Sequence, residues 1–244
     1  MMLRTLLLAL VAGQALAADH AASLDWSGRV SLTLPVAGVL ERVEVQAGQT
    51  VRKDELLAAL NPTLYKAGVA EARADFDRLT QEAADAGRDL DRVTELYART
   101  VASTTELDAA KLRHARAQSG LAAAQARVEK ARRQLAESEL RAPFDAIVLA
   151  RHGEPGQVIT IPCQPAAVVS IARADEWLAR APLDAAQAAN LRLGDDAVVQ
   201  IAGQSVTGRI RALTAQAEGR VLLDVALPRA AGTYAGQGAN IRLP

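Results

Sequence analysis

The feature that most constrains the fold is a short sequence pattern that occurs twice, 108 residues apart. Pro35 is followed thirteen residues later by Gly48, and Pro143 is followed thirteen residues later by Gly156. In each copy apolar and polar residues alternate before the glycine turn, which is typical of short β-strands. Two such copies predict one quasi-symmetric β-sandwich built from two halves. We place the half-motifs at residues 35–60 and 141–168.

The chain between the two copies, residues 61–140, has the composition and periodicity of long helices. Alanine dominates, charges of both signs alternate, and apolar residues recur at steps of three and four, which predicts a coiled coil. Asn61, followed by a proline, predicts the start of one helix, and Ser103 with Glu106 predicts a capping box that starts another. We therefore predict an antiparallel hairpin. Its seam residues are Tyr65, Val69, Ala72, Phe76, Leu79, Ala83, Ala86, Leu90, Val93 and Tyr97, then Leu107, Ala110, His114, Ala117, Leu121, Ala124, Val128, Ala131 and Leu135.

The predicted hairpin offers reach rather than a large core. Each arm spans roughly 50 Å at 1.5 Å per residue. A pair of helices buries little area per residue, so such a projection contributes little stability of its own. Its reach and its exposed tip indicate a spacer or a docking device.

After about residue 168, short apolar segments alternate with glycine turns, which predicts a small β-barrel over residues 169–244. A strand-like segment, 24–34, is expected to complete this barrel from an N-terminal stretch at residues 18–34. One short helix is expected at 184–191, capped by Asp184. The other strand candidates are 177–183, 197–201, 206–212, 221–227 and 239–243. The predicted fold class is α+β, mainly β, with a long inserted helical hairpin and an elongated modular architecture.

The N-terminus has the pattern of a cleavable secretory signal. A basic residue, Arg4, precedes a short apolar stretch, and residues 15–17 read Ala-Leu-Ala, so we predict a signal peptide at residues 1–17. No segment is apolar over the roughly 20 residues that a membrane-spanning helix needs, and no cysteine follows the cleavage site for a lipid. Cys163 is the only cysteine, which rules out an intrachain disulfide and leaves a lone thiol, with pairing between chains as the alternative.

The composition excludes several classes of function. Basic and acidic residues number 28 each, and aromatic residues make up 3% of the chain, so nothing favours a nucleic-acid partner or an aromatic ligand pocket. None of the common hydrolase, nucleotide-binding or zinc-protease motifs occurs. We assign no catalytic, cofactor-binding or metal-binding residue. His114 is expected to set the register of the seam, while His152, beside Glu154, leaves only a weak carboxylate–histidine alternative.

The order of these segments resembles that of the periplasmic adaptor subunits, or membrane fusion proteins, of the HlyD-like family in tripartite efflux pumps. The half-motifs resemble the split lipoyl-like domain of that family, and Leu140-Arg-Ala-Pro-Phe-Asp145 is similar to its return into the second half. The resemblance covers about residues 25–244. It implies a non-enzymatic periplasmic protein without a cofactor. Such a protein links an inner-membrane transporter of the resistance-nodulation-division (RND) type to an outer-membrane channel protein and self-associates into a hexameric ring.

The hairpin tip carries a more specific resemblance. Arg92, Leu96 and Ser103 follow the spacing Arg-x3-Leu-x6-Ser, which is similar to the channel-docking motif of RND-type adaptors. The resemblance implies that these residues bind the channel. A simpler interpretation remains for each residue: a solvated arginine, a continued seam and a helix cap. The predicted partner-binding residues are Arg92, Leu96, Arg99, Ser103, Thr104 and Thr105.

Two departures and two alternatives accompany the resemblance. Members of the family usually carry a membrane anchor and a membrane-proximal domain after the barrel, and here we expect neither, so the protein is either a minimal adaptor or one that needs a second adaptor beside it. An adaptor of an ATP-driven (ABC) exporter is the first alternative. A lipoyl or biotinyl carrier domain is the second, although the helical segment occupies the turn where such a carrier holds its modified lysine.

Overall fold

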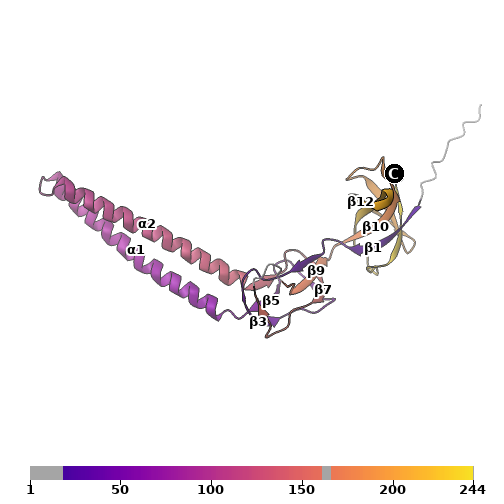
Figure 1. The fold of residues 1–244 in the computed structure, drawn as a ribbon, viewed down its shortest axis with the longest axis horizontal. Coiled ribbons are helices and arrows are strands. Elements are labelled where there is room, and N and C mark those ends of the chain that lie inside the picture. Colours follow the sequence, from indigo (N-terminus) through magenta and orange to yellow (C-terminus); the bar gives the residue numbers. More distant parts are fainter. Residues whose placement is uncertain (1–18, 161–165, 244) are drawn as a thin grey trace, which may run out of the picture. The chain divides into compact units, whose positions relative to one another are not determined.

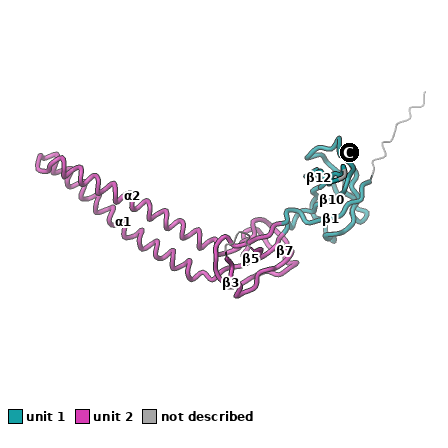
Figure 2. The backbone as a smooth tube through the Cα atoms, viewed as in Figure 1, with its two compact units in different colours: residues 1–29, 172–244 teal, residues 30–171 magenta. Residues whose placement is uncertain are grey.

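The computed structural model describes residues 19–160 and 166–243 of the 244-residue chain (Figure 1). The chain forms two compact units. One unit comprises residues 30–171, and the other comprises residues 1–29 and 172–244 (Figure 2). The first unit is therefore inserted, as a sequence segment, into the second.

A β-sandwich forms the base of the inserted unit. Its two four-stranded sheets enclose a core of leucine, valine and alanine side chains that includes Leu40, Leu57 and Ile171. One sheet has the order β2 (Val30–Leu32), β9 (Val169–Arg173), β7 (Ala146–Arg151), β4 (Thr50–Val51). The other sheet has the order β6 (Glu139–Arg141), β5 (Leu56–Leu60), β3 (Gly38–Val43), β8 (Val158–Ile159).

The two halves of the sandwich are related by the same shift of 108 residues that relates the sequence copies. β3 pairs with β8 through Gly38 and Ile159, and the shifted pair, Ala146 with Val51, joins β7 to β4. Each glycine turn hydrogen-bonds to the other half. The N–H of Gly48 donates to the carbonyl of Val148 at 2.8 Å, and in the shifted turn Gly156 donates to Leu40 at 2.7 Å. The repeat therefore builds one sandwich in which each half completes a sheet of the other.

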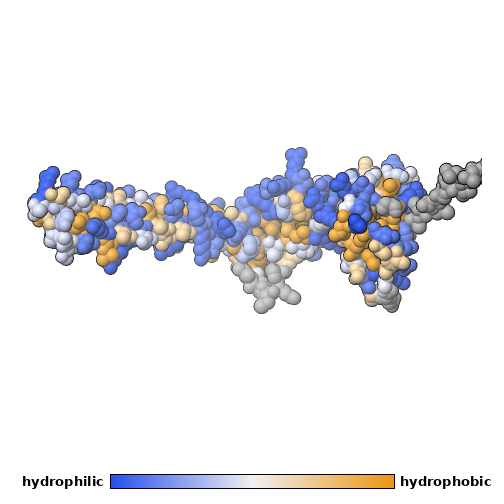
Figure 3. All heavy atoms as spheres, turned by 90° about the horizontal axis from the view of Figure 1, so that it is seen from above, coloured by the Kyte–Doolittle hydropathy of each residue, from blue (hydrophilic) through white to orange (hydrophobic). Residues whose placement is uncertain are grey.

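Helices α1 (Thr63–Ala98) and α2 (Thr104–Glu137) form the antiparallel hairpin. Helix α1 begins at Thr63, directly after Pro62. The N–H of Thr63 donates to the side-chain oxygen of Asn61 at 3.0 Å, so Asn61 caps the first turn. Small or β-branched residues fill the buried centre of the seam. They are Ala83, Val93, Ala110, Ala117, Ala124 and Val128. Hydrophilic residues cover most of the hairpin face in Figure 3, with apolar residues in separate patches.

The other unit is a closed barrel around Trp177, Leu223 and Ile241. Its strands alternate buried and exposed residues, as expected where one face lines a core. The strand order is β1 (Asp19–Trp26), β10 (Glu176–Asp184), β13 (Arg220–Pro228), β12 (Gln204–Ala215), β11 (Asp196–Ile201), β14 (Gly238–Arg242). The remaining elements are α3 (Ala185–Ala188) and the short 3-10 helix η1 (Ala217–Gly219). The predicted fold class, mixed and mainly β with a barrel, a sandwich and a helical hairpin, is confirmed.

Two expected boundaries are wrong. The single strand expected at 24–34 is two strands, because Gly28 adopts a φ of +59° and ends β1 before β2 begins in the sandwich. The second boundary is the expected start of the barrel at residue 169, which falls at the beginning of β9. β9 instead pairs with β2 and buries Val169 in the sandwich core.

Other expectations differ or fall outside the described residues. The short helix expected at 184–191 covers only Ala185–Ala188. The predicted signal peptide at residues 1–17 and the lone thiol of Cys163 lie outside the described part of the chain.

Candidate docking site

The tip of the hairpin is a tight turn between α1 and α2 (Figure 1). Thr100 adopts a φ of +60°, which reverses the chain after Arg99. The carbonyl of Leu96 then accepts hydrogen bonds from the N–H groups of Val101 at 2.9 Å and Ala102 at 3.3 Å. Because these bonds satisfy a carbonyl of the last turn of α1, the turn has a defined conformation.

Ser103 starts α2 with the predicted capping box, which is confirmed. Its hydroxyl oxygen accepts from the N–H of Glu106 at 3.2 Å, and the Glu106 carboxylate accepts from the N–H of Ser103 at 2.7 Å. The backbone N–H and the hydroxyl of Ser103 lower the pKa of Glu106, because both donate to its charged form. The hydroxyl of Ser103 is therefore engaged within the turn.

Arg92 belongs to an ion cluster that joins the two helices. It donates to one carboxylate oxygen of Asp89, and Arg113 of α2 donates to the other at 2.8 Å. The hydrogen bond from Arg92, followed by that from Arg113, holds the pKa of Asp89 below its ordinary value. The side chain of Arg92 nevertheless stays 68% exposed, so it remains accessible to a partner.

Leu96 ends the seam. The sequence periodicity predicts Tyr97 as the last seam residue of α1, but Tyr97 is 40% exposed and Leu96 is half-buried. Arg92 and Leu96, four residues apart, lie one turn apart on the same side of α1. The side chain of Leu96 is therefore more buried than that of Tyr97, and the carbonyl of Leu96 closes the turn.

The outermost surface of the tip comes from other residues. Arg99, Thr104 and Thr105 are exposed, as a docking role requires. Val101 is 71% exposed, and sequence reasoning missed it because it was treated as part of the break in the seam. The signal for its exposure is its position in the turn between Thr100 and Ala102, where the seam is interrupted. All six predicted residues thus lie at one end of the hairpin. Arg92, Leu96 and Ser103 make contacts within it, and every one of the six except the half-buried Leu96 is exposed.

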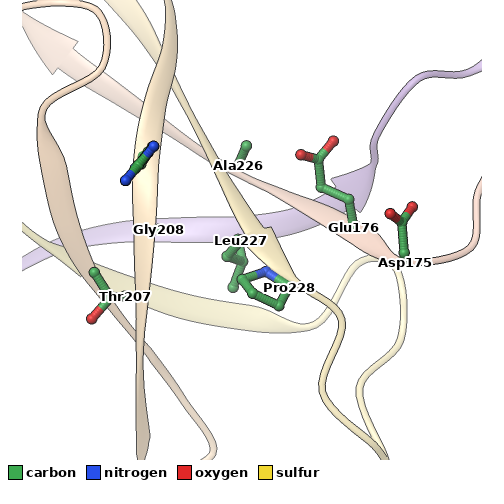
Figure 4. Close-up of a pocket in the computed structure, with 8 residues that line it drawn as sticks. Asp175, Glu176, Thr207, Gly208, Ala226, Leu227 and Pro228 are labelled. Atoms are coloured by element: carbon green, nitrogen blue, oxygen red, sulfur yellow. The ribbon is translucent and has the colours of Figure 1, made fainter.

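The barrel carries a separate open groove of about 420 Å³ (Figure 4). Figure 4 shows the carboxylates of Asp175 and Glu176 at one side and Thr207 at the other, with Leu227 between them. The Glu176 carboxylate already accepts from Arg211 at 2.8 Å and from the hydroxyl of Ser27. The residues that line this groove include no histidine, cysteine or lysine.

Two kinds of feature are absent from the described residues. No group of three or more histidine, cysteine, aspartate and glutamate side chains is placed there to hold a metal ion. No helix in those ranges combines the length and the apolar character needed to cross a membrane.

Comparison with known proteins gives a family and several similar structures. The profile described as CzcB-like, barrel-sandwich hybrid domain matches residues 29–172. A chimeric MacA–MexA protein that contains the Pseudomonas aeruginosa MexA α-hairpin domain is 18% identical, with a TM-score of 0.71 over 93% of this chain and 81% of that chain. No curated protein matches the sequence.

Two other solved structures share the fold. A putative efflux transporter from Bacteroides eggerthii is 19% identical, with a TM-score of 0.58 over 92% of this chain and 68% of that chain. The membrane fusion protein Spr0693 from Streptococcus pneumoniae is 15% identical, with a TM-score of 0.63 over 93% of this chain and 98% of that chain. At these identities the likeness establishes the fold alone.

Proposed function

The chain belongs to the CzcB-like barrel-sandwich hybrid family, and from that membership we propose that it is a periplasmic adaptor of a tripartite efflux system. It links an inner-membrane RND transporter to an outer-membrane channel, and the hairpin tip docks the channel. The observation that carries the proposal is the hairpin itself. Two long helices are inserted between the halves of a sandwich and end in an ordered, exposed turn. Two similar structures, a membrane fusion protein and a putative efflux transporter, support the proposal.

The tip residues have two different roles in docking. Leu96 and Ser103 hold the turn in one conformation, which reduces the entropy lost on binding. Arg99, exposed at the end of α1, is suited to pair with a carboxylate or with helix-end carbonyls. Thr104 and Thr105 present hydroxyl groups beside it, and Arg92 adds a second cation one turn below Leu96. In this role the protein performs no chemistry and need not hold the exported substrate.

Crosslinking in the native host tests the proposal. A tagged chain is crosslinked in cells, and captured proteins are identified by mass spectrometry. We expect capture of an RND transporter and an outer-membrane channel. Capture of an ATP-driven exporter instead would change the class of transporter in the proposal. Capture of neither kind of partner would refute the efflux role.

Variants of the tip test whether this part of the hairpin binds the channel. Leu96→Asp and Arg99→Glu are expected to lose the channel and keep the transporter. Leu64→Asp is the matched control for the first, because Leu64 is 78% exposed at the opposite end of α1. Arg99→Glu leaves the seam intact and so separates docking from folding. Retention of the channel by both tip variants would contradict the tip assignment.

A further inference from the structure

The barrel contains an arginine that lies over two tryptophan rings. Trp26 of β1 and Trp177 of β10 are partners across the two strands, with ring centroids 4.5 Å apart. The guanidinium carbon of Arg229 lies 5.5 Å from the centroid of Trp26 and 4.9 Å from that of Trp177, within the range of cation–π attraction. Trp177 is fully buried, whereas Trp26 and Arg229 are half-buried, so part of this cluster is accessible.

Hydrogen bonds hold the surroundings of this arginine in place. Arg229 is the first residue of the loop that joins β13 to β14, and its N–H donates to the carbonyl of Asp175 at 2.8 Å. Farther along the loop, the hydroxyl of Thr233 accepts from the indole N–H of Trp177 at 2.7 Å and donates to the carbonyl of Ala230 at 2.6 Å. The loop and the rings next to the guanidinium are therefore fixed, which reduces the entropy that Arg229 loses on binding.

Arg229 has no ion pair within the described residues. The barrel unit contains nine arginines over residues 19–29 and 172–243. Six of them pair with an aspartate or a glutamate: Arg29, Arg173, Arg180, Arg209, Arg211 and Arg242. The other two without an ion pair, Arg192 and Arg220, are exposed, so water solvates them. Arg229 differs from both because it is half-buried, with the two rings as the contacts of its guanidinium among the described residues.

The acids at the start of β10 already have partners of their own. The carboxylate of Asp175 accepts two hydrogen bonds from Arg173, each at 3.2 Å, and these hold the pKa of Asp175 below its ordinary value. The carboxylate of Glu176 accepts from Arg211 at 2.8 Å and from the hydroxyl of Ser27. Neither acid is paired with Arg229, so the positive charge of Arg229 is left for an external anion.

The same loop also presents an aromatic ring. Tyr234, five residues after Arg229, is 65% exposed. Its N–H donates to the side-chain oxygen of Gln237 at 3.2 Å, and its carbonyl accepts from the N–H of Gln237 at 3.2 Å, so its backbone is fixed. A Cβ added at Gly232 or Gly236 would meet nothing within 4 Å, so the loop is open on both sides of the tyrosine. A cation and an exposed apolar ring thus belong to one short, ordered loop.

We propose that Arg229 binds the carboxylate of a small organic anion whose apolar part lies against Tyr234 and the exposed part of Trp26. A planar guanidinium pairs with a carboxylate through two parallel hydrogen bonds, and contact with aromatic rings through its face leaves the N–H groups at its edge free to form them. A half-buried charge is also screened by salt less than an exposed one. Such a site lies beyond the proposed function and does not depend on it.

Titration of the purified full-length protein with 4-phenylbutyrate tests the site. The chain has two tryptophans, and both belong to this cluster, so a change in tryptophan fluorescence reports it directly. We expect a saturable change with a Kd of about 1–3 mM, which is typical of a ligand of about twelve non-hydrogen atoms. 4-Phenylbutylamine, which carries a cation in place of the carboxylate, is expected not to bind. No saturable change up to about 30 mM 4-phenylbutyrate, or equal binding of the amine, would overturn the proposal.

Variants assign the binding to single residues, with binding followed through the NMR signals of the ligand so that it does not depend on the tryptophans. Arg229→Gln is expected to weaken binding of 4-phenylbutyrate about tenfold. Arg192→Gln is the matched control, because Arg192 is an exposed arginine of the same barrel, and it is expected to keep the wild-type Kd. If Arg229→Gln lowers the urea midpoint of the barrel, Arg229→Lys replaces it, since lysine keeps the charge but lacks the planar group. Wild-type affinity in the position-229 variant that is used would refute the contact with the carboxylate.

Inorganic phosphate and Tyr234→Ala test the apolar half of the site. Phosphate can pair with a guanidinium but has no apolar part, so we expect it to bind about tenfold more weakly than 4-phenylbutyrate. Tyr234→Ala is expected to weaken 4-phenylbutyrate about threefold to fivefold and to leave phosphate binding unchanged. Equal affinity for the two anions, or wild-type affinity for 4-phenylbutyrate in Tyr234→Ala, would overturn the assignment of an apolar ligand.

Discussion

At the scale of single residues, the tip shows why a docking motif and a structural motif are hard to separate. Arg92 binds Asp89, the carbonyl of Leu96 closes the turn, and the hydroxyl of Ser103 caps α2. Each of these residues therefore contributes to the conformation that a partner meets. The exposed side chains of Arg99 and Val101 make no such contact, because these residues join the turn only through their backbone groups, so substitutions there report docking more directly.

Ser103 allows the two roles to be separated. Ser103→Ala removes the oxygen that accepts from Glu106, and we expect a loss of about 0.5–2 kcal/mol in the free energy of unfolding of the hairpin. Ser103→Asp keeps a capping oxygen and should retain most of that stability. Thermal unfolding followed by circular dichroism measures both. If channel capture falls equally in both variants, the hydroxyl itself binds the partner; equal stability of the two variants would argue against the cap.

Gly208 of β12 lies where two strands approach closely. A Cβ at this position would be 2.7 Å from the carbonyl oxygen of Ala226 and 2.7 Å from a methyl of Val225. We expect Gly208→Ala to lower the free energy of unfolding of the barrel by about 1–3 kcal/mol. Gly238→Ala is the matched control, because nothing lies within 4 Å of its Cβ. Urea unfolding curves for both variants make the comparison, and equal midpoints would refute the close approach.

At the scale of elements, the hairpin combines a seam of small residues with ion clusters at its edge. Ala117 and Ala124 let the helices approach closely but specify the register weakly, as uniform small residues do. The bridges from Asp75 and Asp89 to α2 supply that specification, because a shift by one turn breaks both. His114 lies opposite Gly87, where an added Cβ would be 3.8 Å from the imidazole. The large ring of α2 therefore lies level with a residue of α1 that has no side chain.

The ion clusters make the hairpin sensitive to acid. Arginine partners hold the pKa values of Asp75 and Asp89 below their ordinary value of 3.8. A lowered pKa stabilises the fold above the unfolded value, and the contribution is lost as pH falls through the folded value. We therefore expect the thermal midpoint of the helices to fall below about pH 4, when circular dichroism is recorded between pH 7 and pH 2.5.

Asp75→Asn/Asp89→Asn tests the cause of that sensitivity. This variant is expected to be less stable than the wild type at neutral pH and to lose less on acidification. Asp77→Asn, which removes an exposed carboxylate without an ion pair in the described residues, serves as its control. An unchanged acid dependence in the double variant would show that other carboxylates are responsible.

Some features of these elements can be predicted from the sequence and others cannot, for physical reasons. Long periodic patterns determine the hairpin and its seam, and the capping box marks the start of α2 at Ser103. The end of the seam is harder, because Leu96 and Tyr97 are both apolar and only the turn geometry decides which one packs inward. The break within residues 24–34 depends on the positive φ of Gly28, and one glycine in an apolar stretch does not reveal it.

At the scale of the whole molecule, each unit has a core of its own. The sandwich core consists of strand and loop residues. From α1, the side chain of Tyr65 packs against this core. The tryptophans Trp26 and Trp177 both lie in the barrel, with ring centroids 4.5 Å apart, and Arg229 lies over them. Tryptophan fluorescence therefore reports the barrel, while helical circular dichroism reports mainly the hairpin.

Removal of the hairpin tests this independence. The N–H of Leu60 donates to the carbonyl of Ser138 at 2.9 Å, so a short glycine-serine linker can replace residues 62–137. We expect the shortened chain to lose the helical signal and channel capture but to keep the native tryptophan emission and its unfolding midpoint. Emission at the wavelength of the unfolded chain would show instead that the barrel depends on the hairpin.

The nested order of the elements has a consequence for how the protein is made. The barrel closes only when β1 pairs with β14, and Asp19 and Arg242, which meet there, are separated by 223 residues. At about 5–20 residues per second, a ribosome completes that stretch in about 10–45 s. β10 becomes available earlier, but the edge of β1 that pairs with β14 has no partner for all of that interval. Among the described strands, the first to be synthesised thus completes its pairing only with the last, and until then one of its edges is open to pairing with another chain.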